Sequence, residues 1–268
     1  MDLLDALLLG LVEGLTEYLP VSSTGHLIVT QRLLGIPASA EANAFAIAIQ
    51  AGAILAVLSV YRQRAVGVAR GLLGRDDAGR RLGLALAAAF APAAVAGLLF
   101  DDWIEARLFG LAPVVAAWAA GALVMLAFDG RARRGTLGLE ALTPRMAVFI
   151  GLAQCAALWP GVSRSLATLM GGVLVGLSLP AAVEFSFLLG VLTLGAATAY
   201  KSLDAGAAMW AAYGPGPLLV GAGSAWLSAW VAVRGMVAWL QRRGLRIFAA
   251  WRLVAAAAVG GAMAMGWL

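Results

Sequence analysis

Stretches of apolar residues long enough to cross a lipid bilayer recur along this chain of 268 residues. A transmembrane helix needs about 20 predominantly apolar residues. Hydrophobic residues make up 62% of the chain and charged residues only 12%, which excludes an ordinary soluble domain. The sequence therefore predicts an all-α polytopic membrane protein embedded in the lipid bilayer. Six predicted transmembrane helices run approximately over 44–61, 82–100, 111–128, 183–200, 214–233 and 247–267.

Two further apolar segments, 3–36 and 146–178, are interrupted near their middles by Pro, Gly, Ser and charged residues. Each holds about 33 residues, which is too long for one span and too short for two spans with a loop. Irregular backbone at membrane depth is tolerated only where protein buries it or where it lines a cavity. We therefore predict that each segment is a re-entrant helical hairpin.

Arginines in the connecting loops predict how the chain is oriented, because cytoplasmic loops carry an excess of Lys and Arg. The loops 62–81, 129–145 and 234–246 are rich in arginine, whereas 101–110 and 201–213 are not. We expect the first three loops to be cytoplasmic and the other two to be external. Six spans satisfy this alternation only if both interrupted segments return to the side where they started. The arginines concerned are Arg62, Arg64, Arg70, Arg75, Arg80, Arg81, Arg131, Arg133, Arg134, Arg145, Arg234, Arg242, Arg243 and Arg246.

This alternation places the first hairpin on the external face and the second on the cytoplasmic face, as in two inverted halves. Gly10-Leu-Val-Glu13 followed by Pro20-Val-Ser-Ser resembles Gly151-Leu-Ala-Gln154 followed by Pro160-Gly-Val-Ser, at an offset of about 140 residues. Inverted repeats with broken helices are a known membrane architecture; chance similarity between helices rich in Ala, Leu and Gly is the alternative. We predict a single membrane domain, 1–268, with inverted halves of approximately 1–130 and 140–268. The loop arginines also account for the net charge of +5, so no nucleic-acid partner is predicted.

The first interruption gathers ionisable groups that are costly at membrane depth and are read by default as functional. Glu13 and Glu17 project from one face of a helix, one turn apart. They could neutralise Arg164, bind a hydrated divalent cation, or act as a base on water. Carboxylates and hydroxyls without a cysteine ligand suit Mg²⁺ or Ca²⁺ better than zinc. The run reads Glu13-Gly-Leu-Thr-Glu17-Tyr-Leu-Pro-Val-Ser22-Ser23-Thr24-Gly25-His26.

Three further polar residues are candidates for the site. His26, the only histidine, can titrate near neutral pH and so could protonate a leaving phosphate or deprotonate a nucleophile; a structural hydrogen bond is the alternative. Ser23 is a candidate nucleophile or phosphate donor, and helix capping is its alternative. Gln50 lies inside an apolar span, where it either lines the cavity or makes an interhelical hydrogen bond.

The second interruption places an arginine inside an apolar segment, where it needs a carboxylate or an anionic ligand as partner. Its planar guanidinium suits phosphate oxygens. The upstream Pro160-Gly161 permits a sharp turn, after which a helix would begin and offer free N–H groups to an anion. An arginine that reaches the membrane interface beside an N-cap serine is the alternative. The residues expected to line this pocket are Ser163, Arg164, Ser165 and Thr168.

Both interruptions, Glu13 to His26 and Leu-Trp-Pro-Gly-Val-Ser-Arg-Ser, resemble the undecaprenyl-diphosphate phosphatase family of the bacitracin-resistance type. The resemblance covers nearly the whole chain, including Phe45 to Gln50 and Glu184-Phe-Ser-Phe-Leu-Leu. It implies an integral enzyme of the bacterial inner membrane that removes the terminal phosphate of a polyprenyl diphosphate lipid. It also implies a periplasm-facing site and a requirement for Mg²⁺ or Ca²⁺.

By position, the resemblance assigns catalytic roles to Glu13, Glu17, Ser23, His26 and Arg164, with Glu13 and Glu17 as metal ligands. The expected substrate-binding residues are Ser22, Thr24, Gln50, Ser163, Ser165 and Thr168. The chain departs from the family at Leu166, where Gly is usual, and at Leu192, where Pro is common. A bulkier Leu166 is expected to narrow the pocket or shift the backbone.

The predicted function is hydrolysis of undecaprenyl diphosphate to undecaprenyl phosphate and inorganic phosphate, which recycles the cell-wall carrier lipid. A carrier or flippase for a polyprenyl phosphate lipid is the alternative, because inverted halves with broken helices also build transporters. The clustered acid, base and hydroxyl groups favour the enzyme. The sequence does not decide the oligomeric state, so a homodimer stays open.

Overall fold

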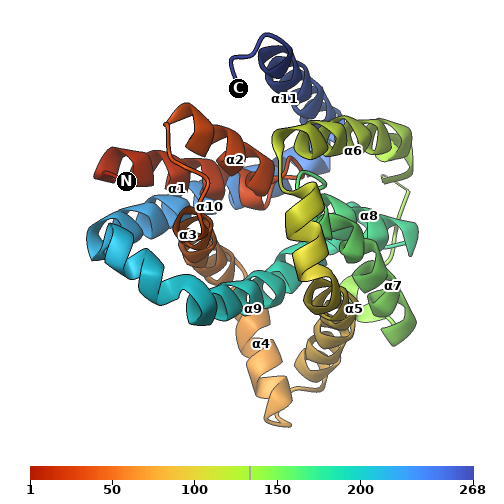
Figure 1. Cartoon of the computed structure of the whole chain (residues 1–268). Helices are drawn as coiled ribbons and strands as arrows, with labels where there is room; N and C mark the ends of the chain where they lie inside the picture. The colour runs from red at the N-terminus through yellow and green to blue at the C-terminus, as the bar shows by residue number, and fades with distance from the viewer. Residues whose placement is uncertain (133) are drawn as a thin grey trace.

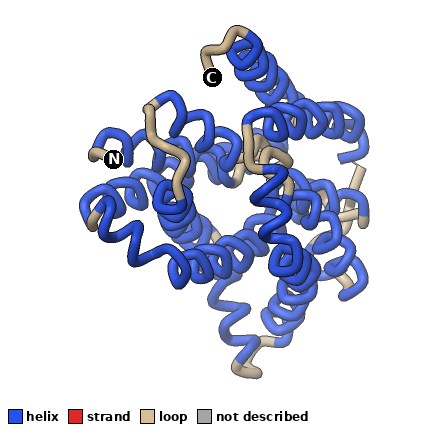
Figure 2. Tube along the Cα trace, in the orientation of Figure 1, coloured by secondary structure: helices blue, strands red, loops and turns tan. Residues whose placement is uncertain are grey.

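Helices make up the regular structure of this protein in a computed structural model that describes residues 1–132 and 134–268 (Figure 1). Arg133, one of the predicted cytoplasmic arginines, lies outside the described residues. Among those described, six helices are long and apolar enough to cross a membrane, which confirms the predicted class. They are α3 (Ala40–Val60), α5 (Asp77–Leu108), α6 (Leu111–Ala132), α9 (Leu179–Tyr213), α10 (Pro215–Arg243) and α11 (Arg246–Ala264). In Figure 2 the helices are joined by short loops, and no strand is drawn in the described part of the chain.

Several helices continue beyond the predicted spans into charged sequence. Helix α5 runs to Leu108 and α9 to Tyr213, so the predicted loops 101–110 and 201–213 are mostly helical, and the loop prediction was wrong there. Hydropathy marks the apolar window of a helix, whereas Arg, Lys, Glu and Ala keep the backbone helical beyond the lipid. The same correction applies to 62–81, which contains α4 (Arg62–Leu72), and to 234–246, which α10 largely fills. The assignment of these segments to opposite membrane faces stays a prediction.

Each interrupted apolar segment folds as two short helices joined by an irregular turn. The first pair is α1 (Leu3–Glu17) and α2 (Ser23–Leu33), which pack against each other. The second pair is α7 (Pro144–Cys155), extended by a 3₁₀ turn η2 (Ala156–Leu158), and α8 (Arg164–Leu174). At about 1.5 Å per residue, the longest of the four is about 22 Å, short of the roughly 30 Å hydrocarbon core. The re-entrant course of the pairs and the inversion of the halves stay predictions.

The two turns share an unusual backbone conformation. Ser22 and Ser163 have φ angles of 73° and 79°, and they are the only non-glycine residues with positive φ in the described part of the chain. Each immediately precedes the second helix of its pair. A positive φ is uncommon for a residue with a side chain, and such strain persists only where the surroundings impose it. We refer below to residues 18–22 as the first break and to residues 159–163 as the second break.

Close helix packing positions the first pair. A Cβ at Gly10 or at Gly14 would overlap the backbone and a serine hydroxyl of α10, so only glycine permits this approach of α1. Small residues four positions apart allow such contact between membrane helices. Helix α10 packs in turn on α3, and α3 on α9 (Figure 1).

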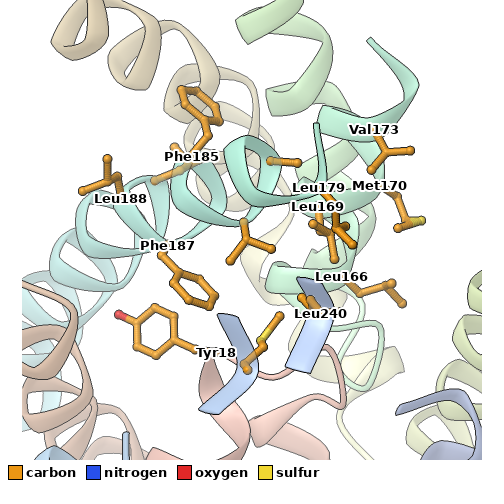
Figure 3. Close-up of a cluster of buried hydrophobic side chains, with 14 of the residues drawn as sticks. Tyr18, Leu166, Leu169, Met170, Val173, Leu179, Phe185, Phe187, Leu188 and Leu240 are labelled. Carbon is orange, nitrogen blue, oxygen red and sulfur yellow. The ribbon is translucent and has the colours of Figure 1, made fainter. Parts of the chain in front are cut away.

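The main hydrophobic core lies beside the two breaks and contains residues from both halves of the chain. The rings of Tyr18 and Phe187 meet edge to face with centroids 5.1 Å apart (Figure 3). Leu166 is buried in the same cluster and does not line the cavity described below, so its bulk is accommodated by the core. Leu192 is exposed on the outside of α9. Neither departure from the family pattern therefore narrows the pocket.

Candidate active site

An ion pair joins the two breaks. The Nη2 atom of Arg164 donates to Oε1 of Glu17 at 2.9 Å, and the two side chains are only 9% and 6% exposed. Arg164 is the first residue of α8, and Glu17 is the last residue of α1. Nη1 of Arg164 also donates to the Ser186 carbonyl at 2.9 Å, and its guanidinium lies 5.2 Å from the centre of the Tyr18 ring. These contacts hold the guanidinium in one orientation.

A hydroxyl lies on the other oxygen of the same carboxylate. Ser23 Oγ donates to Oε2 of Glu17, and both groups are buried. Glu17 thus holds the arginine with one oxygen and the serine with the other. In this arrangement the carboxylate can accept the proton of the hydroxyl, which would make the serine oxygen a stronger nucleophile.

Serine hydroxyls make a second connection between the breaks. Ser165 Oγ donates to the Leu19 carbonyl at 2.9 Å, so the Ser163 hydroxyl must be the donor in its 2.9 Å contact with Ser165 Oγ. Ser163 Oγ also accepts from the N–H of Leu166 at 3.2 Å and so caps α8. These bonds explain the burial of both hydroxyls.

The breaks open into a cavity of about 540 Å³. The part of the cavity that the two breaks line, called its inner end below, is polar, whereas the walls from α3, α5 and α9 are largely apolar. Helices α2 and α8 both begin at this inner end, so two helix N-termini with free N–H groups favour an anion there. The polar lining residues at or beside the breaks are Glu17, Ser22, Ser23, Thr24, Ser163 and Arg164, and α3, α7 and α9 add Gln50, Gln154 and Thr193.

Glu13 lies one turn before Glu17 on α1 and has no exposed surface. Neither of its carboxylate oxygens has a hydrogen-bond partner, although Glu17 and Arg164 are near enough to interact with it electrostatically. An unpaired buried carboxylate is costly, which fits a group that is partnered only when a ligand is bound. Among the described residues no cluster of three or more His, Cys, Asp or Glu side chains could hold a metal ion. A divalent cation here would therefore take most of its ligands from substrate and water.

His26 lies outside the cavity lining, as Glu13 does, whereas Ser22, Ser23 and Thr24 line the cavity. Its Nδ1–H donates to the Ser22 carbonyl at 2.7 Å, and its Nε2 accepts from the indole N–H of Trp251 at 2.9 Å. The ring also packs at 4.8 Å from the Trp118 ring, measured between centroids. Both nitrogens are therefore occupied, and the structure does not bring His26 together with Ser23 and Arg164. Its catalytic role stays a prediction.

Of the remaining predicted residues, Gln50 lines the cavity, whereas Thr168 supports a helix that borders it. Thr168 does not line the cavity; its hydroxyl contacts Ser186 Oγ at 2.6 Å and bonds to the Arg164 carbonyl at 2.9 Å. Thr168 thus fixes the first turn of α8. Gln50 lines the cavity wall from α3, as one of its two alternatives predicted.

Sequence reasoning missed two residues that support the site. Ser186, on α9, contacts both Arg164 and Thr168. Its apolar neighbours Phe185 and Phe187 gave no reason to assign it to a polar site. Arg252, on α11, is completely buried and bonds to the carbonyls of both breaks. Arg252 does carry a signal, because an arginine inside an apolar span is the same feature that singled out Arg164.

The fold and this site define a class: a polytopic helical membrane protein in which two broken helix pairs build a pocket lined by an arginine and by a serine that is hydrogen-bonded to a carboxylate. Comparison with known proteins assigns the chain to one family. The family model described as bacitracin resistance protein BacA matches residues 6–258, and the chain belongs to this family.

Several curated relatives align along almost the full chain. An undecaprenyl-diphosphatase from Sorangium cellulosum is 46% identical over 262 residues, covering 95% of this chain and 84% of the relative. One from Nitratidesulfovibrio vulgaris is 43% identical, covering 95% and 96%. An undecaprenyl-diphosphatase 2 from Rhodospirillum rubrum is 44% identical, covering 94% and 91%.

Proposed function

We propose that this protein is an integral membrane phosphatase that hydrolyses undecaprenyl diphosphate to undecaprenyl phosphate and inorganic phosphate, and so recycles the carrier lipid of cell-wall synthesis. The family membership and the names of the relatives support this substrate. The observation that carries the proposal is the shared carboxylate of Glu17, which holds Arg164 and Ser23 side by side at the inner end of the cavity.

The anion would be held by Arg164 and by the N-termini of α2 and α8. Guanidinium binds phosphate oxygens through paired N–H groups, and helix N-termini add free donors. In a low-dielectric cavity such fixed donors stabilise the charge that develops during phosphoryl transfer. The apolar walls of the cavity suit the first isoprene units of the lipid.

In the proposed reaction, Ser23 Oγ attacks the terminal phosphorus while its proton passes to Oε2 of Glu17. The bond between that phosphorus and the bridging oxygen breaks, and undecaprenyl phosphate leaves with the bond electrons. Water then attacks the phosphorus of the phosphoserine and the bond from phosphorus to Ser23 Oγ breaks. Ser23 Oγ takes back its proton from Glu17, and both protons of the water leave with the phosphate as H2PO4⁻. Nucleophile, base and anion-binding arginine all come from one chain, so this reaction needs no second copy.

Glu13 and Glu17 are the residues that would hold Mg²⁺ or Ca²⁺. The two unpartnered oxygens of Glu13 support this assignment. Such hard cations accept one or two carboxylates together with substrate phosphates and waters. A bound cation would add positive charge beside the diphosphate oxygens.

The cavity is proposed to open toward the periplasm from the inner membrane. Its lining also includes Asp101, Tyr200 and Lys201. Asp101 and Lys201 are the first residues of 101–110 and 201–213, the two segments poor in arginine that are expected on the external face, and Tyr200 immediately precedes the second segment. Substrate on the outer leaflet would thus reach the breaks without crossing the membrane.

Purified protein in detergent, supplied with undecaprenyl diphosphate and Mg²⁺, tests the function against the carrier alternative. The expected result is stoichiometric release of inorganic phosphate together with undecaprenyl phosphate. Liposomes containing a labelled lipid diphosphate serve as the companion measurement. Movement of the label across the bilayer without phosphate release would contradict the phosphatase and favour a carrier.

A further inference from the structure

Arg252 is a completely buried arginine on α11 that uses all five of its N–H groups. Every acceptor is a backbone carbonyl. Nε donates to Trp118 at 3.1 Å; Nη1 donates to Pro20 at 3.2 Å and Val162 at 3.0 Å; Nη2 donates to Ala117 at 2.7 Å and Gly161 at 2.8 Å.

These acceptors join parts of the chain that are far apart in sequence. Pro20 belongs to the first break, and Gly161 and Val162 belong to the second. Carbonyls in such turns have no helical partner and need another donor when they are buried. One guanidinium therefore donates hydrogen bonds to carbonyls of both breaks and fixes the distance between the breaks. It does so from the side of the fold where α6 and α11 lie.

The charge of Arg252 has no carboxylate partner among the described residues. A buried cation costs several kcal/mol unless good hydrogen bonds offset the loss of water, here about five charge-assisted bonds. Well-packed apolar side chains often replace such a buried charge without loss of stability. Retention of an arginine here favours a requirement for geometry over a requirement for stability.

We propose that Arg252 is a positioning residue for phosphoryl transfer, which sets the spacing between the two breaks so that Ser23 and Arg164 engage the same phosphate. The inference rests on the proposed function. Glu17 and Ser23 immediately flank the first break, and Arg164 follows directly after the second. Small shifts between donor and nucleophile are costly, because a misplacement of about 1 Å can lower the rate by about a hundredfold. Arg252 does not itself line the cavity, although its partner Gly161 does, and it contacts none of the proposed reacting groups.

Anchoring of α11 to α6 is the competing explanation, since Ala117 and Trp118 lie on α6. Gly121 offers a second, independent way to disturb the guanidinium, and the distance between the breaks decides between the two explanations. A Cβ at Gly121 would overlap the guanidinium of Arg252, so Gly121→Ala displaces this group while leaving the arginine itself in place.

The experiment uses the full-length protein in detergent with three variants: Arg252→Lys, which keeps the charge but has fewer donors, Gly121→Ala, and Arg246→Lys as matched control. Arg246 lies on the same helix with a side chain that is 78% exposed. Cysteines at Leu33 and Leu174, in a Cys155→Ala background, carry spin labels that report the distance between α2 and α8. Labels at Leu203 and Leu219 report a control distance between α9 and α10, whose contact does not involve Arg252.

Arg252→Lys and Gly121→Ala should broaden the distribution of distances between positions 33 and 174 and leave the control distance unchanged. Their kcat should fall by about tenfold to a hundredfold, with KM within about twofold of the unsubstituted protein, because binding groups remain while alignment is lost. Arg246→Lys should change neither quantity.

An unchanged distance between positions 33 and 174 in both variants would overturn the proposal, whatever the rate. A broadened distance with an unchanged kcat would overturn it as well, because the spacing would then not govern catalysis. A changed or broadened control distance in both variants would show that Arg252 has a general role in folding. That result would overturn the proposed positioning role. Failure of the unsubstituted protein to release phosphate would instead reject the proposed function, and the distances would still be measurable.

Discussion

The Arg164 guanidinium contacts the Glu17 carboxylate at 2.9 Å, although the two residues are 147 positions apart in the chain. Both side chains are nearly inaccessible to solvent. Breaking such a buried pair by removing one partner costs about 3–5 kcal/mol, because the other charge is left uncompensated. The pair therefore fixes the Arg164 guanidinium beside the two breaks, where the proposed reaction needs it to bind phosphate.

Ser23→Ala should lower kcat by about a thousandfold, because it removes the proposed nucleophile while leaving Glu17 and Arg164 paired. Rapid acid quench of the unsubstituted protein with a substrate labelled at the terminal phosphate should trap label on the protein. The label should be absent from Ser23→Ala. A variant that retains more than about a tenth of the rate would show instead that Ser23 only orients a water.

Glu13→Gln should weaken the dependence on divalent cation without unfolding the protein. The substitution is isosteric and replaces a buried carboxyl group whose oxygens have no hydrogen-bond partner, so the melting temperature should stay level or rise. Added Mg²⁺ should raise the melting temperature of the unsubstituted protein and leave that of Glu13→Gln unchanged. An equal Mg²⁺-induced rise in both proteins would remove Glu13 from the metal site.

His26→Gln should reduce kcat by about tenfold and leave the shape of the pH–rate profile unchanged. Both ring nitrogens are already hydrogen-bonded, one to the Ser22 carbonyl and one to Trp251, so the ring supports the first break and does not face the cavity. The pH dependence of kcat is the deciding measurement. Disappearance of a limb near neutral pH in His26→Gln would favour the alternative, acid–base catalysis.

Gly97→Leu should raise KM for undecaprenyl diphosphate by about tenfold, because the new side chain enters the apolar part of the cavity. A Cβ at Gly97 meets Leu158 at 3.6 Å, an ordinary contact, so the helix itself tolerates the change. Farnesyl diphosphate should be affected equally, since it presents the same first isoprene units. Gly195→Leu, at a position with open space and outside the lining, is the matched control. An unchanged KM in Gly97→Leu would place the lipid elsewhere.

The interruptions in apolar sequence were the most predictable part of the site. Ionisable groups next to Pro and Gly are too costly in lipid to lack a role, so Glu17 and Arg164 could be singled out individually, and Ser23 as a hydroxyl in the same run as Glu17. The six transmembrane helices were equally predictable, because each apolar span is longer than a buried helix of a soluble protein usually is.

Contacts between distant parts of the chain could not be predicted in the same way. Whether His26 turns toward the cavity depends on Trp251, which is 225 positions away in sequence. Whether an arginine serves the site depends on which carbonyls surround it, and Arg252 meets those of three separate segments. Helix ends such as Leu108 and Tyr213 were also missed, because the hydropathy signal stops where charged residues continue the helix.

Phosphate release by Arg164→Ala and Arg164→Lys, measured on purified protein with undecaprenyl diphosphate and Mg²⁺, tests most directly whether the two breaks meet around one diphosphate. Circular dichroism and size-exclusion profiles identical to those of the unsubstituted protein serve as the check on folding. We expect release to be abolished in Arg164→Ala and reduced by about a hundredfold in Arg164→Lys, because lysine lacks the paired N–H groups. Release by folded Arg164→Ala at the unsubstituted rate would contradict the central claim.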